Sequence, residues 1–196
     1  MLQVRQFVNS MFSSNTFVLF EENYNYCWLV DIGDAKEIID VLPNGCEVKG
    51  LFLTHTHFDH IYGINVLWQA FPKMKVFTSA YGKKALYDAK LNLSYYHEDP
   101  IEYAGKEVTV LREGDEIEIF PDIKVEAMET PGHCPSCITY NVQSYLFTGD
   151  SHIPGLKVAT RLPRADKSLA LDSEKRIIQL SAGKTICSGH GKMVKM

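Results

Sequence analysis

The sequence lacks long apolar runs and runs of like charge. Residues 1–20 have none of the basic start, apolar stretch and small-residue cleavage site of a secretion signal, and no segment approaches the length of a membrane span. The 20 basic residues are spread along a chain of formal net charge -4, which excludes an extended patch for polyanions. We therefore expect a soluble, cytoplasmic protein with no membrane or nucleic-acid partner.

The chain has few cysteines, and their number is odd. The five are Cys27, Cys46, Cys134, Cys137 and Cys187. A chain of 196 residues that is 45% hydrophobic can bury one substantial core without disulfides. We therefore expect reduced thiols and a single domain over residues 1–196. Cys134 and Cys137 form a C-P-S-C motif, and such a pair can be redox-active or metal-binding. The alternative that we favour is two small buried thiols at the start of a strand.

Strand and helix patterns follow one another in a mixed order. Runs rich in β-branched and aromatic residues predict strands, and apolar positions at helical spacing predict helices. The predicted strands are 15–20, 26–32, 48–54, 74–78, 107–111, 116–120, 123–129, 137–142, 145–148 and 184–188, and the predicted helices are 34–42, 60–71, 80–90 and 173–181. Residues 15–32 are expected to form a hairpin, and the strands from 107 onward to form the second half of the fold. Two sheets packed face to face, with helices outside, would bury these runs in one core.

Histidine is concentrated at one point of the sequence. Thr54-His55-Thr56-His57-Phe58-Asp59-His60 follows a predicted strand and holds three of the seven histidines. Alternating imidazoles in a loop can converge on one ion, while Asp59 and His60 point toward a neighbouring ion. Without a metal, such crowding would cost polar solvation and gain little packing. The cluster therefore predicts a metal site.

Three further strand ends carry a glycine followed by a potential ligand. These pairs are Gly132-His133, Gly149-Asp150 and Gly189-His190. A glycine lets the backbone turn sharply and bring the next side chain close to a shared point, although each pair alone could be an ordinary turn. Taken with the cluster, four strand ends supply seven candidate ligands, which are His55, His57, Asp59, His60, His133, Asp150 and His190.

These motifs, in this order, resemble the metallo-β-lactamase fold superfamily, most closely its small hydrolases similar to glyoxalase II. The resemblance rests on THTHFDH at 54–60, TPGH at 130–133, FTGD at 147–150 and SGHG at 188–191, supported by SNTFVL at 14–19 and LVDIGD at 29–34. It implies an α/β fold, a four-layer αββα sandwich with the metals in a shallow cleft along one edge of the sheets. It also implies that one metal is held by His55, His57 and His133, the second by Asp59, His60 and His190, and that Asp150 bridges them.

The expected reaction is hydrolysis of a small-molecule substrate. Two divalent ions roughly 3.5 Å apart lower the pKa of a bridging water enough to hold hydroxide at neutral pH, and polarise a substrate oxygen. We expect zinc, with iron or manganese as alternatives, and attack on the carbonyl of a thioester, ester or lactone. Asp59 is the candidate for orienting the hydroxide and delivering a proton to the leaving group. Asp31 is expected to fix the tautomer of a ligand histidine, or to be a structural turn carboxylate.

Substrate contacts are expected around the cleft. The segment 151–172 leaves the bridging Asp150 without predicted regular structure and is a natural wall of the cleft. The candidate contacts are Phe58, Tyr62, His152, Lys157, Arg161 and Arg164. The three cations could bind an acidic group or be solvated surface charges. His152 could contact substrate or support the ligands from behind, and the two aromatic residues could line an apolar mouth or pack in the core.

Departures from relatives narrow the choice of substrate. Glyoxalase II proper has a C-terminal helical domain that helps to hold glutathione, whereas six residues follow His190 here, so we expect a substrate other than a glutathione thioester. Antibiotic-destroying β-lactamases are exported and lack a bridging residue like Asp150, which argues against that activity. RNA-processing relatives carry insertions that grip nucleic acid, and this leaves a phosphodiester hydrolase as a weaker alternative.

Two alternatives belong to other functional classes. A persulfide dioxygenase would use a single iron, held by His55, by His57 or His133, and by Asp150. A binding or regulatory module would keep the fold without the chemistry. The complete set of seven candidate ligands argues against the binding module, because degenerate members of the superfamily lose ligands.

Overall fold

The fold is described by a computed structural model that covers residues 1–196. The strands are β1 Gln3–Val8, β2 Asn15–Phe20, β3 Tyr26–Val30, β4 Glu47–Phe52, β5 Lys75–Thr78, β6 Val108–Val110, β7 Glu116–Phe120, β8 Ile123–Glu129, β9 Ile138–Val142, β10 Tyr145–Gly149, β11 Thr185–Ser188 and β12 Val194–Lys195. The helices are α1 Ala35–Val41, α2 Ile64–Ala70, α3 Ala80–Ala85 and α4 Lys167–Leu180, with 3-10 turns at Phe58–His60 and Ser94–Tyr96. No helix is long and apolar enough to cross a membrane.

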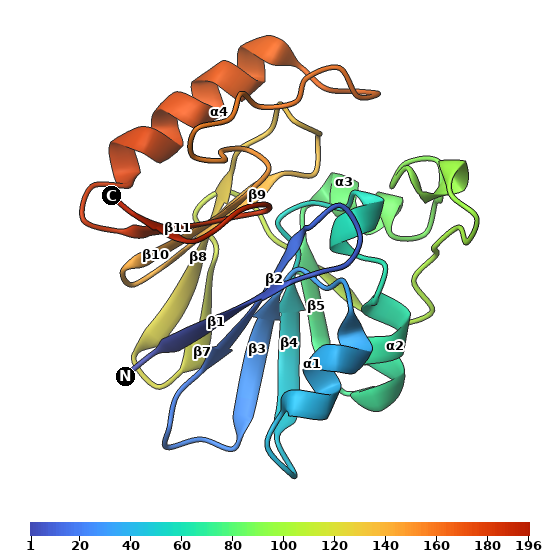
Figure 1. The fold of residues 1–196 in the computed structure, drawn as a ribbon, viewed down its shortest axis with the longest axis vertical. Helices are drawn as coiled ribbons and strands as arrows, with labels where there is room; N and C mark the ends of the chain where they lie inside the picture. The colour runs from blue at the N-terminus through green and yellow to red at the C-terminus, as the bar shows by residue number, and fades with distance from the viewer.

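The strands form two six-stranded mixed sheets. The first has the order β1-β2-β3-β4-β5-β6 and the second the order β12-β11-β10-β9-β8-β7. Helices α1 and α2 pack against the outer face of the first sheet, and α4 packs against the second (Figure 1). The αββα sandwich expected from the sequence is confirmed.

Alternation along the strands separates three apolar layers. Phe17 and Leu19 of β2 face the core between the sheets, whereas Val18, between them in sequence, faces the helices. The core between the sheets also takes aromatic rings from both sides, such as Phe52 of β4 and Tyr140 of β9, whose ring centroids are 5.2 Å apart. This packing fixes how the strand ends of one sheet lie relative to those of the other.

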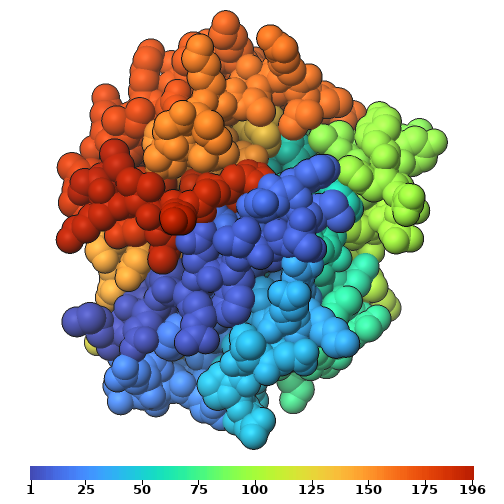
Figure 2. Space-filling view, viewed as in Figure 1, coloured from blue at the N-terminus to red at the C-terminus, as the bar shows by residue number.

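The start of β2 and the end of β11 meet at the edge of the sandwich where β4 and β10 end. The Asn15 N–H donates to the Gly189 carbonyl at 2.7 Å, and the Asn15 side chain donates to the carbonyls of Ser188 and Gly191 at 2.9 and 2.8 Å. Figure 2 shows the resulting contact, with the C-terminal residues in red lying against the N-terminal residues in blue. Hydrogen bonds between distant segments thus hold this edge together.

Three strands differ from the sequence predictions, and one of them, the two-residue edge strand β12, was not predicted. The edge strand β1 was missed, because it pairs only with β2 and its half-buried and exposed residues include Gln3, Arg5 and Gln6. The strand predicted at 107–111 exists as β6, but it pairs in parallel with β5 and so completes the first sheet rather than opening the second. A strand of three residues carries no local signal of its sheet partner.

Three helix boundaries differ from their predictions. Helix α4 begins at Lys167, inside the segment expected to be irregular, because the Asp166 side chain accepts hydrogen bonds from the Ser168 and Leu169 N–H groups at 2.8 and 3.0 Å. The helix predicted at 60–71 is divided into a 3-10 turn and α2, since the His60 carbonyl accepts instead from the Ile32 N–H at 2.9 Å. The helix predicted at 80–90 ends at Ala85 and continues as turns.

A hydroxyl in the core provides a test of the packing between the sheets. The Tyr140 hydroxyl is buried and donates to the Leu53 carbonyl, just before the histidine cluster, at 2.8 Å. Tyr140→Phe keeps the ring but leaves that carbonyl without its donor, so we expect the free energy of unfolding to fall by about 1–2 kcal/mol in urea denaturation. Tyr96→Phe, at a ring that is 71% exposed, is the control and is expected to change nothing. Equal unfolding midpoints for both variants would contradict the role given to this hydrogen bond.

Candidate metal centre

All four motif-bearing loops leave strand ends at one edge of the sandwich. Residues 54–60 follow β4, 130–133 follow β8, Asp150 follows β10 and His190 lies just past β11. Two glycines make the close approach possible. A Cβ at Gly149, whose φ is +50°, would lie 2.4 Å from Thr54 Oγ1, and a Cβ at Gly189 would lie 2.1 Å from Asp150 Oδ1.

Two groups of side chains converge at this edge. His55, His57 and His133 each present a ring nitrogen within 4.8 Å of the others, and the His57 Nδ1 and His133 Nε2 atoms are 2.9 Å apart. Asp59, His60 and His190 form the second group, in which Asp59 Oδ2 lies 3.4 Å from the Nε2 atoms of both histidines. Each group offers three donors to one point.

Asp150 lies between the two groups and contacts both. Its Oδ2 atom is 3.5 Å from the Nε2 atoms of His133 and His190, and its Oδ1 atom is 3.7 Å from His60 Nε2. The structure therefore brings together all seven residues that the sequence singled out as candidate ligands.

Several of these atoms are buried without a hydrogen-bond partner. They are His55 Nε2, His60 Nε2 and Asp150 Oδ1. A buried polar atom that has neither a partner nor water carries a desolvation cost. Imidazole nitrogen and carboxylate oxygen are ligands that divalent ions of the zinc type accept. The donor set therefore fits divalent metal ions, which would satisfy these atoms together.

A single carboxylate, Asp31, orients two of the histidines. It accepts hydrogen bonds from His60 Nδ1 at 3.0 Å and from the Thr54 N–H and hydroxyl at 2.7 and 2.6 Å. The Thr54 hydroxyl in turn lies 3.1 Å from His55 Nδ1, from which it can accept. Both histidines therefore keep Nε2 free for the centre. Asp31 adopts a left-handed φ of 55°, and its oxygens are occupied by these partners.

Backbone carbonyls orient two more ligand candidates. His133 Nδ1 donates to the Ala159 carbonyl at 2.9 Å, and His190 Nδ1 donates to the Phe12 carbonyl at 3.1 Å. Neither Phe12 nor Ala159 was singled out from the sequence. No local signal identifies them, because the contact is made by a main-chain carbonyl that every residue possesses.

The metal-free site divides its histidines into neutral and charged ones. Burial lowers the pKa of His55 well below its usual value, that of His57 to about 3, and that of His133 as well. Against the effect of burial, hydrogen bonds with Asp150 and Asp59 raise the pKa of His190 to about 10.

The pKa of His60, like that of His190, is raised. Burial opposes its charge, but Asp59 and Asp31 raise the pKa of His60 well above its usual value. The same cations hold the pKa values of Asp59 and Asp150 well below the ordinary carboxyl range, despite burial of both groups. Without metal, two imidazolium groups therefore offset the buried carboxylates.

The aromatic candidates flank the centre in different ways. Phe58 lines the cleft over the site and stacks on His97, with ring centroids 3.9 Å apart. Tyr62 lines a neighbouring hollow, and its hydroxyl donates to Asp34 at 2.7 Å. Burial raises the pKa of Tyr62 to about 12. Phe12 and His97, which the sequence did not single out as site residues, also line the cleft, and they reach it through tertiary packing alone.

The polar candidates of segment 151–172 do not line this cleft. Lys157 and Arg161 line a separate groove beside α4, and Arg164 lines neither hollow. His152 is buried and faces Glu174 of α4, with 3.3 Å between His152 Nδ1 and Glu174 Oε1. The segment instead contributes Ala159 and Leu162 to the wall of the cleft.

Cys134 and Cys137 lie in the turn that follows His133. Both are buried free thiols, with their sulfur atoms 3.4 Å apart. Ser136 between them accepts hydrogen bonds from the Thr56 N–H and hydroxyl, both at 3.1 Å. The C-P-S-C turn thereby contacts the loop that carries His55 and His57.

Two curated hydrolases are similar to this chain in sequence. Hydroxyacylglutathione hydrolase from Hamiltonella defensa subsp. Acyrthosiphon pisum (strain 5AT) is 31% identical over 179 residues, which are 90% of this chain and 62% of the relative. The enzyme of the same name from Salmonella typhi is 29% identical over 186 residues, covering 90% of this chain and 64% of the relative. The chain thus spans less than two thirds of the length of these curated relatives.

Solved structures agree on the architecture. BLEG-1 B3 metallo-beta-lactamase superposes with a TM-score of 0.89 at 26% identity, over 98% of this chain and 93% of that one. The di-iron-bound form of TTHA1623 superposes with a TM-score of 0.81 at 22% identity, over 97% and 94% of the two chains, and shows the fold alone. The family model of the metallo-beta-lactamase superfamily matches residues 12–190, which include all seven converging side chains. This chain belongs to the metallo-beta-lactamase superfamily.

Proposed function

We propose that this protein is a hydrolase that binds two divalent metal ions and cleaves a thioester or ester carbonyl of a small molecule. The observation that carries the proposal is the position of Asp150, whose two oxygens contact histidines of both ligand groups. A carboxylate placed in this way suits a bridge between two ions. Membership of the superfamily supports metal-dependent hydrolysis.

Each ligand group is proposed to hold one ion. His55, His57 and His133 are proposed to hold the first, and Asp59, His60 and His190 the second, with Asp150 shared. The unpartnered buried atoms His55 Nε2 and His60 Nε2 support one ligand in each group. Zinc is the proposed metal because it accepts histidine and carboxylate ligands, and iron or manganese can use the same donors.

Bound divalent ions would supply a nucleophilic water at neutral pH and a Lewis acid for the substrate oxygen. Asp59 lies at the mouth of the site, with its Oδ2 atom 3.4 Å from the Nε2 atoms of both His60 and His190. An ionised carboxylate there can accept a proton from the attacking water and return it to the leaving group. Phe12, Phe58 and Leu162 line the opening and would limit the access of other water.

The proposed substrate class follows from the named relatives. Two curated relatives at about 30% identity are hydroxyacylglutathione hydrolases, which supports a thioester. The expectation that glutathione is not the thiol carrier stays a prediction. The expectation against β-lactam hydrolysis also stays a prediction. The similarity to BLEG-1 B3 metallo-beta-lactamase is a reason to assay a β-lactam together with the thioesters.

Metal content tests the two-ion site directly. We expect about two zinc ions per chain by elemental analysis of protein purified without added metal, or soaked in zinc and desalted if it is purified without metal, because two donor groups share Asp150. Asp150→Asn replaces one oxygen of the shared carboxylate by an amide nitrogen and removes its negative charge. We expect this substitution to weaken zinc affinity about tenfold or more. His152→Asn, at a buried histidine outside the ligand groups, is the matched control. One iron per chain with persulfide oxidation would favour the dioxygenase alternative, and a chain that takes up no metal would contradict both.

Substitution of Asp59 tests the proton-transfer role. Asp59→Asn keeps the shape of the side chain but removes its basicity, so we expect kcat to fall by about 10²–10⁴ with an unchanged circular dichroism spectrum. Thioesters including S-lactoylglutathione, lactones, a phosphodiester and a β-lactam form the substrate panel. Asp172→Asn, at an exposed position of α4, is expected to retain full activity. Unchanged turnover in Asp59→Asn would refute the role.

Metal uptake is expected to release protons. His60 and His190 have raised pKa values in the metal-free chain and are protonated at pH 7, so a metal must displace about two protons to bind them. Zinc affinity should therefore rise with pH from neutral toward the pKa of His190, about 10. Calorimetric titration in two buffers of different ionisation enthalpy measures the released protons. Binding heats that do not depend on the buffer would show that both histidines are already neutral.

A further inference from the structure

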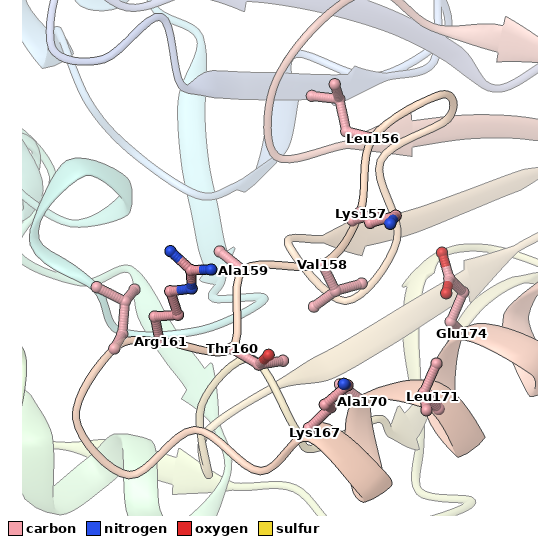
Figure 3. Close-up of a pocket in the computed structure, with 11 residues that line it drawn as sticks. Leu156, Lys157, Val158, Ala159, Thr160, Arg161, Lys167, Ala170, Leu171 and Glu174 are labelled. Atoms are coloured by element: carbon pink, nitrogen blue, oxygen red, sulfur yellow. The ribbon is translucent and has the colours of Figure 1, made fainter.

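A second hollow opens beside the metal centre, between the loop 156–162 and helix α4. It has a volume of about 910 Å³, within the range of small-molecule sites. Figure 3 shows Val158 and Thr160 of the loop on one side, with Ala170 and Leu171 of α4 opposite. We call this hollow the α4 groove.

The α4 groove adjoins the cleft over the candidate ligands. Ala159 and Leu162 line both hollows. The Ala159 carbonyl also accepts the hydrogen bond from His133 Nδ1 at 2.9 Å. A substrate with its carbonyl at the centre can therefore extend past Ala159 into the groove.

The lining of the groove includes apolar side chains that are partly exposed to solvent. Leu156, Leu162 and Leu171 are 61%, 39% and 48% exposed, and all three surround the same hollow. Single exposed leucines are ordinary, but several around one concave site indicate a ligand that covers them. Their burial by an alkyl chain would contribute to binding in proportion to the chain's length.

The charged side chains that line the groove favour an anionic ligand. Lys157, Arg161 and Lys167 line it and form no salt bridge within the chain. The only acidic side chain in the lining, Glu174, faces His152. Three cations without carboxylate partners, in a chain of net charge -4, give the groove a local positive character that suits a carboxylate.

The positions of Asp59 and His133 decide which half of the substrate enters the groove. The leaving group must lie near Asp59, the proposed source of its proton, which is 3.4 Å from His190. The acyl half then points toward the other ligand group, where His133 contacts Ala159. The acyl chain, rather than the thiol or alcohol, is thus aimed at the groove.

We propose that the α4 groove binds the acyl chain of the substrate, and that the preferred substrates are thioesters or esters of medium-chain acids with a carboxylate at the far end. This substrate class rests on the proposed hydrolysis at the metal centre. The leucines would cover the chain, and Lys157, Arg161 or Lys167 would pair with the terminal carboxylate.

A thioester series with one small leaving group, N-acetylcysteamine, tests the inference. We expect kcat/KM of the zinc-loaded enzyme to rise about tenfold or more from acetyl to octanoyl, and severalfold further for the suberoyl half-thioester. Leu171→Asp is expected to reduce the octanoyl-to-acetyl ratio about tenfold. Leu169→Asp is the matched control, because Leu169 is 46% exposed on the same helix but lies outside the groove lining. Lys167→Gln should reduce the suberoyl-to-octanoyl ratio.

A binding measurement separates this inference from the hydrolase proposal. Suberate added to the zinc-loaded protein is expected to shift the methyl NMR signals of Leu156 and Leu171, and not those of Leu169. If suberate shifts these signals but no thioester is cleaved, the proposed function fails and the groove assignment stands. If acetyl thioester is cleaved but chain length has no effect and suberate causes no shift, the groove assignment is overturned and the hydrolase proposal stands. Equal losses in Leu169→Asp and Leu171→Asp would also overturn it.

Discussion

The arrangement of the candidate centre depends on the burial of the Asp150 carboxylate. A carboxylate at this depth requires positive charge and hydrogen-bond donors, because its desolvation is otherwise unfavourable. Without metal, His60 and His190 meet this requirement as imidazolium groups. Gly189 leaves the space that the carboxylate occupies, because a Cβ there would lie 2.1 Å from Asp150 Oδ1. Divalent ions would replace the two protons by stronger charges at the same place.

The contacts that support the ligand candidates extend from this carboxylate to β3 and to the N-terminal loop. Asp31 orients His60 directly and His55 through Thr54. The N-terminal loop contributes the Phe12 carbonyl to His190, and the Ser14 hydroxyl donates to the Asp59 carbonyl at 2.7 Å. Since these partners come from strands far apart in sequence, the centre forms only when the sandwich has assembled.

Much of the fold and the ligand set could be predicted, because their signals are local. The H-x-H-x-D-H spacing and the Gly-His and Gly-Asp pairs are readable in short windows, as are the strands with β-branched and aromatic residues. The start of α4 was also locally encoded, by Asp166 as the helix cap, although the irregular composition before it obscured the signal. The sheet partner of β6 and the place of Phe12 beside His190 depend on distant segments. Phe12 also adopts a left-handed φ of 52°, which a phenylalanine does not predict.

The seven converging residues are divided between the sheets. His55, His57, Asp59 and His60 leave the first sheet, whereas His133, Asp150 and His190 leave the second. Each proposed ion would therefore be ligated from both sheets and would cross-link them at one edge. The Tyr140–Leu53 hydrogen bond joins the same two layers a few residues away. Small changes in the apolar contact between the sheets would alter the distance between the two halves of the ligand set, so that residues remote from the substrate can tune metal affinity.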